Sequence, residues 1–255
     1  MENEGKYIYC IIPTQNDRVF GAIGIGGRGD EVMTIGYQDL AMVVSNHPMK
    51  IKVQRDNLLA HEMVIETVLK EFNSVLPVRF GTIASNADEI RSLLDRRYRE
   101  FKSLLRDMDH LIELGVRGVW SDMNTIYREI ENTEAEIRQE KARIVHDGGV
   151  NNDENRERVG KMVKLALQDK KQREAEIIVD ALRRSAYEYK VHPTTGDEAF
   201  LNAVFLVDRG REKEFDNLMD DLSEQYQNRV NFVYAGPLPV FNFANITIYP
   251  EEWER

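Results

Sequence analysis

Residues 24–29, GIGGRG, have the spacing G-x-G-x-x-G of a dinucleotide-binding loop. In such a loop a helix begins at the third glycine, so that its free N–H groups and its dipole meet the pyrophosphate. Here Gly29 is followed by DEVMTIGY, a pattern that predicts a strand. We therefore interpret residues 24–29 as a flexible connection between strands and expect no nucleotide there.

His61 and Glu62 form a second candidate pair, because zinc proteases carry H-E-x-x-H on one helix. The second histidine of that motif would stand at position 65, which is Ile65. His61 lies on the apolar stripe of an expected helix, which favours a packed histidine over a metal ligand. The five histidines are scattered without ligand spacing, and the single cysteine, Cys10, lies in an apolar run. We predict no metal site, no cofactor and no disulfide.

Arg79 interrupts the apolar stretch VLPVRFGT (75–82), where it lies between Pro77 and Gly81 and just before Phe80. Its guanidinium is expected on the face opposite the core, where it could pair with a carboxylate of a neighbouring helix or contact a partner protein. Nothing near it supplies a general base together with a nucleophile. The sequence therefore predicts no enzyme activity.

The segment AGPLPVFNFANI (235–246) combines two prolines, Pro237 and Pro239, with two aromatic residues, Phe241 and Phe243. Proline fixes φ and removes an amide donor, so the segment must be extended and cannot be a central strand before residue 240. Two interpretations remain open. The segment is either a rigid crossover whose aromatic residues fill the core, or a preformed surface that presents Val240 and Phe241 to an apolar partner.

Composition narrows the class of protein. The chain has 255 residues, 42% of them hydrophobic, which is enough for one large or two small domains. Its formal net charge of −10 repels nucleic acid and anionic lipid. No run approaches the length of a membrane-spanning helix, and the N-terminus has no signal-peptide pattern. We expect a cytoplasmic protein that binds neither nucleic acid nor membrane.

The elements that must position these residues follow from periodicity. Strands are expected at residues 7–12, 32–37, 40–45, 75–82 and 115–120. Helices are expected over residues 56–72, with Asp56 as N-cap, and from a capping pair Asn86 and Glu89 to Leu111. This order predicts an α+β first domain, residues 1–114, with helices on one face of a mainly antiparallel sheet.

Charged residues dominate between positions 121 and 189, where Ile130, Ile137 and Ile144 lie seven residues apart. That narrow seam, the glycine pair Gly148 and Gly149, and a second helical pattern predict a long antiparallel helical hairpin. Strands are then expected at 199–207, 228–236 and 241–249, and a helix at 212–226. We expect residues 115–255 to form a second α+β domain.

Three segments together carry a resemblance to a known family. They are YIYCIIP near the start, NLLAHEMVIETVLKEFNSVLPVRFGT (57–82) and GPLPVFNFANI (236–246). The chain resembles, over nearly its whole length, the GvpF/GvpL family of gas vesicle accessory proteins. The family often has G-P-W-P-P-Y-x-F near its C-terminal end, where this chain has Leu238, Val240 and Phe241. The signature positions are His61, Glu62, Pro77, Arg79, Phe80, Gly81, Gly236, Pro237, Pro239, Phe241 and Phe243.

The resemblance implies two domains, the first a modified ferredoxin-like fold and the second an α+β unit with helical additions. It also implies a non-enzymatic role in the gas vesicle. Such a protein would bind the hydrophobic main shell protein, limit its aggregation and assist nucleation, with other gas vesicle accessory proteins as further partners. At the signature positions it implies interaction or packing.

Two alternative functions belong to other classes. A small-molecule-binding or enzymatic protein would use a pocket between the domains and would carry a ligand through purification. An RNA-binding ferredoxin-like protein would stack bases on a basic sheet face, which the acidic composition opposes.

Overall fold

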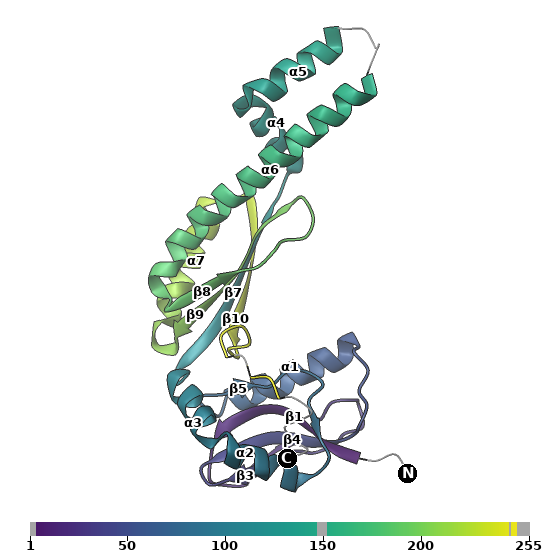
Figure 1. Ribbon diagram of the computed structural model, residues 1–255. Helices are drawn as coiled ribbons and strands as arrows, with labels where there is room; N and C mark the ends of the chain where they lie inside the picture. Colours follow the sequence, from purple (N-terminus) through teal and green to yellow (C-terminus); the bar gives the residue numbers. More distant parts are fainter. Residues whose placement is uncertain (1–3, 147–151, 245, 249–255) are drawn as a thin grey trace. The chain divides into compact units, whose positions relative to one another are not determined.

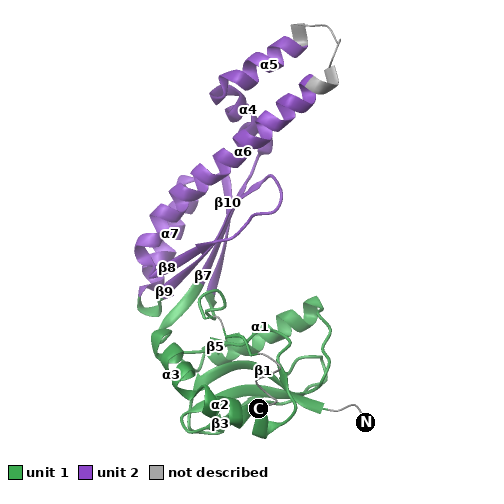
Figure 2. Ribbon diagram, viewed as in Figure 1, with its two compact units in different colours: residues 1–113, 208–210, 237–255 green, residues 114–207, 211–236 purple. Residues whose placement is uncertain are grey.

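A computed structural model describes residues 4–146, 152–244 and 246–248. The chain forms two compact units (Figure 2): residues 1–113, 208–210 and 237–255 make unit 1, and residues 114–207 and 211–236 make unit 2. The expected domain boundary after residue 114 lies one residue from the boundary between residues 113 and 114. The grouping of residues 237–255 with unit 1 was not expected, and independent folding of the two parts stays a prediction.

Unit 1 is built on a sheet in the order β2-β3-β4-β1-β5, with β6 also paired to β1. Its strands are β1 (Glu4–Pro13), β2 (Val19–Gly21), β3 (Val32–Tyr37), β4 (Leu40–Pro48), β5 (Leu76–Pro77) and β6 (Ile83–Ala84). Its helices are α1 (Arg55–Leu69), α2 (Ala87–Arg96) and α3 (Tyr98–Asp107). The α+β class is confirmed.

The central strand β1 is buried on both faces, since neighbouring residues such as Tyr7 and Ile8 are both fully inaccessible. On one face, Tyr7 and Tyr9 belong to a core cluster with Val64 and Val68 of α1. Helices α2 and α3 contact β1, β3 and β4 from the other face (Figure 1). The expectation that all helices lie on one face is wrong, because a strand whose residues are all apolar needs cover on both sides.

The strands expected at residues 7–12, 32–37 and 40–45 are confirmed as β1, β3 and β4, with Gln38 in the tight turn between the last two. The strand expected over residues 75–82 is wrong beyond Leu76–Pro77. Pro77 stands in the edge strand β5, as its missing amide requires. After it the chain turns at Gly81, whose φ of +88° favours glycine.

The helix expected from Asn86 to Leu111 is two helices, because the chain breaks at Arg97 (φ −103°, ψ 17°) between α2 and α3. The capping pair is confirmed. The Asn86 side chain accepts hydrogen bonds from the Asp88 and Glu89 amides, and the Glu89 carboxylate accepts one from the Ser85 amide. Asp56 is not the N-cap of α1; Gln54 holds that position without a side-chain hydrogen bond.

Unit 2 has a sheet in the order β10-β7-β9-β8. Its strands are β7 (Leu111–Trp120), β8 (Glu188–Val191), β9 (Ala199–Asp208) and β10 (Val230–Leu238). Its helices are α4 (Met123–Thr133), α5 (Ala135–His146), α6 (Asn152–Leu182) and α7 (Glu212–Gln225). Helices α6 and α7 run along the sheet (Figure 1), and Phe215 of α7 packs on Phe205 of β9 with ring centroids 5.2 Å apart.

The helical hairpin is present, but its first limb breaks at Glu134 into α4 and α5. Ile130 and Ile137 are buried, as the seam predicts. The expected turn at Gly148 and Gly149 lies outside the described residues. Strand β8 overlaps the end of the range assigned to the hairpin, residues 121–189, and was not expected, since a run of four residues that includes Glu188 and Lys190 gives no clear period.

The strand expected over residues 241–249 is wrong where the chain is described. Residues 241–243 form a turn, and Ile246 makes a single parallel bridge to Val78 of unit 1. The preceding strand β10 runs from Val230 to Leu238 and includes Pro237, which an edge strand tolerates.

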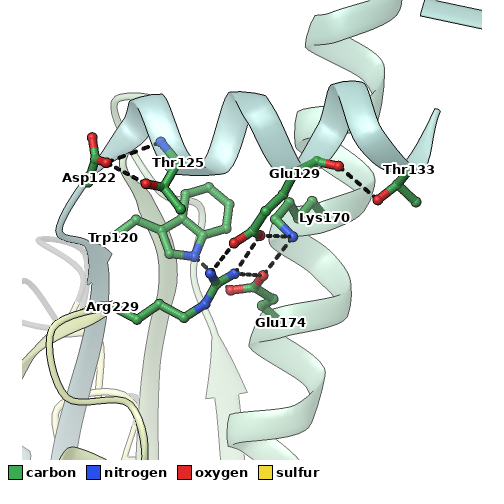
Figure 3. Close-up of polar contacts among 8 residues, drawn as sticks. All are labelled: Trp120, Asp122, Thr125, Glu129, Thr133, Lys170, Glu174 and Arg229. Carbon is green, nitrogen blue, oxygen red and sulfur yellow. Dashed lines mark hydrogen bonds and ion pairs between the residues drawn. The ribbon is translucent and has the colours of Figure 1, made fainter. Parts of the chain in front are cut away.

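A charged network holds the base of the hairpin on the sheet of unit 2 (Figure 3). The Arg229 guanidinium donates to both oxygens of Glu129 on α4, at 2.5 and 2.9 Å, and to Glu174 of α6 at 2.7 Å. Lys170 pairs with both carboxylates, and the Trp120 indole N–H donates to Glu174 at 2.7 Å. The network therefore ties α4, α6, β7 and the start of β10 together.

The hydrogen bond from Arg229, helped by Lys170, lowers the pKa of Glu129 from 4.5 to about 2. A depressed carboxylate pKa means that the unfolded chain binds its proton first as the pH falls. The ionised network thus stabilises the fold fully above about pH 4.5, and this contribution is lost as the pH falls toward 2.

We expect Glu129→Gln to lower the free energy of unfolding by roughly 1 to 2 kcal/mol, because a charge-assisted bidentate pair is replaced by a neutral one. Urea unfolding measures the loss, and hydrogen exchange of the α4 amides shows where it occurs. The matched control is Glu136→Gln, an exposed residue of α5. An equal loss in both variants would contradict the structural role of the network.

Candidate protein-interaction site

A cleft of about 280 Å³ in unit 1 is lined by α1, by the segment that follows β5, and by the turn after β10. The residues that line it are Leu58, His61, Glu62, Pro77, Val78, Arg79, Phe80, Phe241, Ala244 and Ile246. Six of them are signature positions. Segments that lie more than 150 residues apart in the sequence thus form one site, joined by the Val78–Ile246 bridge.

His61 forms the floor of this cleft and is 3% exposed. Its ring stacks on Tyr9 and meets Tyr7 and Phe80 edge-on. The Tyr7 hydroxyl accepts a hydrogen bond from the Gly81 amide and lies 2.9 Å from His61 Nδ1. The expectation of a packed histidine is confirmed, and its contacts explain why the His61 and Phe80-Gly81 positions occur together.

Burial lowers the pKa of His61 to about 4, although a hydrogen bond with the Val78 backbone acts in the opposite direction. The ring is therefore neutral near pH 7. His61 of α1 contacts the Tyr7 hydroxyl of β1 through one ring nitrogen and forms a hydrogen bond with the Val78 backbone. It therefore connects α1, β1 and the segment after β5. Burial likewise raises the pKa of the Tyr7 hydroxyl above its usual range.

Glu62 and Arg79 are the charged residues of the cleft, and both are exposed. Partial burial, and then the neighbouring Glu66, raise the pKa of Glu62. The Arg79 guanidinium makes no hydrogen bond or ion pair with any residue that the structure describes. The expected pairing of Arg79 with a helix carboxylate is therefore wrong within those residues, because the chain turns at Gly81 and directs this side chain to solvent.

Phe241 is held at the cleft by a turn with a buried carboxylate at its base. The amides of Phe243 and Ala244 donate to the Val240 carbonyl at 3.1 and 2.8 Å. Glu113, which is 2% exposed, accepts from the Asn242 backbone amide at 2.8 Å and from its side-chain amide at 2.5 Å. Val240 is buried while Phe241 remains 36% exposed, so the turn fixes one residue and presents the other.

An apolar patch adjoins the cleft on α1. Leu58, Leu59 and Met63 are 38%, 51% and 49% exposed. Leu59 and Met63 are one helical turn apart and lie on the same side of the helix. Together with Phe241, they give this part of unit 1 several large apolar side chains in contact with water, which is typical of an interaction surface.

The remaining signature positions have other places. Gly81 donates its backbone amide to the Tyr7 hydroxyl. Gly236 and Pro237 lie in the exposed end of β10, Pro239 is buried, and Phe243 is half-buried in the turn. None of these lines the cleft. Whether any signature position contacts a partner stays a prediction.

The other motifs of the sequence have structural places. GIGGRG lies between β2 and β3, so the loop is followed by a strand as expected. Within the loop, the Ile25 amide donates a hydrogen bond to the Tyr9 hydroxyl at 2.8 Å. Cys10 is buried. In the described part of the chain no three His, Cys, Asp or Glu side chains group as a metal site would require. Across the same residues no helix has the length and apolar character to cross a membrane.

Sequence reasoning missed four features of the site. They are Leu58 and Met63 on α1, the Tyr7 hydroxyl beneath His61, and the Glu113–Asn242 contact. Leu58 lies three residues before His61, so periodicity places both on one apolar stripe and does not reveal which end of that stripe extends beyond the sheet. The Tyr7 and Glu113 contacts join residues distant in sequence and leave no local signal.

We expect the unfolding free energy to fall by up to about 3 kcal/mol as the pH drops from 7 to 4, because the unfolded chain protonates His61 near pH 6.5 and the folded chain resists until about pH 4. In His61→Gln this dependence should be largely absent above pH 4.5, where the depressed carboxylates remain ionised. Urea unfolding across this range measures it. An NMR titration of the wild-type ring near pH 6.5 would contradict the buried, neutral assignment.

Comparisons with known proteins identify the family and the fold of the chain. The family model described as gas vesicle synthesis protein GvpL/GvpF matches residues 5–245. Gas vesicle protein F of Streptomyces sp. (strain CB03234) is 29% identical over 223 residues, which cover 87% of this chain and 91% of that protein. Gas vesicle protein F1 of Halobacterium salinarum (strain ATCC 700922 / JCM 11081 / NRC-1) is 27% identical over 252 residues, which cover 98% and 97%.

Among solved structures, the crystal structure of GvpF from Anabaena sp. PCC7120 superposes with a TM-score of 0.81. The match covers 95% of this chain and 99% of that one at 20% identity, so it establishes a shared fold. The resemblance drawn from the sequence is thereby confirmed. The chain belongs to the GvpL/GvpF family of gas vesicle synthesis proteins.

Proposed function

We propose that this protein is a non-enzymatic assembly protein of the gas vesicle, which acts in the cytoplasm and on the growing vesicle. It binds the hydrophobic main shell protein, limits aggregation of that subunit and assists nucleation. The observation that supports this most is the cleft of unit 1, where the 57–82 and 236–246 segments meet beside exposed apolar residues.

The apolar patch gives this proposal its energetic basis. Leu59, Met63 and Phe241 remain in contact with water although the fold has a well-filled core beneath them. Covering large apolar side chains releases free energy in proportion to the apolar area removed from water. Met adapts to irregular surfaces and Phe supplies a rigid anchor, a combination suited to a hydrophobic partner.

The polar residues at the cleft supply orientation. The Arg79 guanidinium has no partner among the described residues and is available to a carboxylate of the bound subunit, in the bidentate geometry that arginine favours. Glu62 offers a charge of the opposite sign from α1. The net charge of −10 on the whole chain keeps a complex with an aggregation-prone subunit dispersed.

The same geometry argues for binding rather than catalysis at this cleft. His61, its one imidazole, is buried and already bonded to the Tyr7 hydroxyl and the Val78 backbone. A general base needs a nitrogen that faces the substrate. Other gas vesicle accessory proteins are further partners under this proposal.

Co-expression with the main shell protein tests the proposal. We expect the wild-type protein to raise the soluble fraction of that subunit and to co-purify with it at moderate salt, since the contact is apolar. Phe241→Ala and Met63→Ser should each lower the co-purified amount by roughly three-fold or more, as truncating an anchor at the centre of an interface does.

The matched control is Leu165→Ala, which removes an apolar side chain of α6 in unit 2 that is 63% exposed, more than either Met63 or Phe241. Circular dichroism and urea unfolding must show that all variants fold. Equal recovery of the shell protein with wild type, Phe241→Ala and Met63→Ser would reject the cleft as the binding site. No complex with wild type would reject direct binding.

A further inference from the structure

Strand β8 forms one edge of the unit 2 sheet, and all four of its residues are exposed. The opposite edge, β10, contains Pro237, which lacks an amide, and Gly236 with a φ of +152°. A proline on an edge strand protects that edge against pairing with another strand. Strand β8 contains no proline and keeps all of its backbone amides, so the two edges of the sheet differ in their capacity to pair.

The backbone groups that β8 directs outward follow from its pairing with β9. Residues Glu188 and Lys190 pair with Leu206 and Val204, and the His192 amide donates to the Asn202 carbonyl at 2.7 Å. In an antiparallel ladder, residues that bond to the partner strand alternate with residues that do not. Residues 188, 190 and 192 therefore bond to β9. The Tyr187 amide also faces β9, since it donates to the Leu206 carbonyl at 2.8 Å, and the N–H and C=O groups of Tyr189 point away from the sheet.

The charged side chains along this edge have opposite signs on the two sides of Tyr189. The sequence is Tyr187, Glu188, Tyr189, Lys190, Val191, so that an acid precedes the central tyrosine and a base follows it. Tyr187 and Val191 are 70% and 54% exposed. A strand of this composition is complementary to itself when a second copy runs antiparallel to it.

We propose that this protein self-associates through β8, with Tyr189 of one copy facing Tyr189 of a second copy across a two-fold axis. Each Tyr189 then exchanges both of its backbone hydrogen bonds with the other. Glu188 lies opposite Lys190 of the second copy, and the reverse pair forms by symmetry. These are the non-hydrogen-bonded positions of the ladder, where side chains are closest and opposite charges stabilise the pair.

Charge and hydrogen bonding select this register over its neighbours. Centring the pair on Lys190 would oppose two lysines and use backbone groups already bonded to β9. Centring it between two residues would likewise place groups that face β9 at the new interface. The self-complementary order of charges is the reason for choosing a second copy as the occupant, rather than a strand from another protein.

A groove beside the edge receives the exposed aromatic residue. It has a volume of about 460 Å³ between α6 and β8, and Tyr189, Val191 and Pro193 are among its lining residues. Tyr189 stacks on Phe205, which packs on α7, so this row of side chains lies on the helix-covered face. In the proposed pair, Tyr187 of the second copy lies opposite Val191 of the first. Its ring then reaches this groove and becomes less exposed to water.

Sedimentation equilibrium of the full chain tests the proposal. We expect the average mass to rise from monomer to dimer over roughly 1 to 100 µM, since one strand pair buries less area than a permanent interface. Glu188→Lys and Lys190→Glu should each raise the dissociation constant about ten-fold, because each opposes like charges twice. An equimolar mixture of these two variants should associate again, since every cross-strand pair is then acid to base.

The double variant, Glu188→Lys with Lys190→Glu, should also dimerise as the wild type does. Lys213→Glu, an exposed position on α7, controls for the change in net charge and should leave the dissociation constant unchanged. Unfolding midpoints at low concentration must match between variants. A wild-type protein that stays monomeric throughout, or variants whose mixture stays monomeric, would overturn self-pairing and leave the edge to a strand of another protein.

Discussion

Unit 1 depends on the burial of one strand on both faces. Every residue of β1 from Tyr7 to Ile12 is fully inaccessible, so cover is required from α1 on one side and from α2 and α3 on the other. The two tyrosines of this strand are buried with hydroxyls that must be hydrogen-bonded. Tyr9 satisfies this through Ser45 and the glycine loop, and Tyr7 through His61 and Gly81.

The second of these contacts connects the core to the surface. Because the Tyr7 hydroxyl joins α1 to the turn after Phe80, it fixes the two walls of the cleft relative to each other. The third wall, which carries Phe241, is fixed separately by Glu113. A set of buried polar contacts thus supports an exposed apolar rim. The exposed apolar side chains around the cleft therefore keep their positions when no partner covers them, as a preorganised binding surface requires.

Unit 2 distributes its polar groups differently. Its charged network lies where the hairpin leaves the sheet, and it restrains α4 and α6 by directional bonds beside the buried side chains of Trp120 and Ile130. Along the sheet, β10 carries a proline and β8 does not. Directional bonds between charged groups thus add to the apolar packing of α6, whose Leu167, Ile178 and Leu182 are buried, and the β8 edge lacks the proline of β10.

The sequence by itself determined the class of nearly every element. Periodicity located β1, β3, β4, α1, α7 and β9 to within a few residues, and the Asn86 cap followed from local hydrogen-bonding chemistry. It also predicted correctly that a strand follows GIGGRG, since the pattern directly after Gly29 is a local feature. These features depend on contacts within about one helical turn or between adjacent strands, which a local pattern records.

Only the tertiary structure decided which distant segments meet. It places Phe241 and Ala244 beside His61 in the cleft of unit 1. It also leaves Arg79 unpaired among the described residues, and it leaves Leu58 and Met63 exposed to water. All three results depend on contacts between segments that are distant in the sequence. The same holds for β8, whose four residues become a strand only because β9 offers them a ladder. Such contacts are decided by the packing of the whole unit, because the free energy of burial depends on every surface that an element covers.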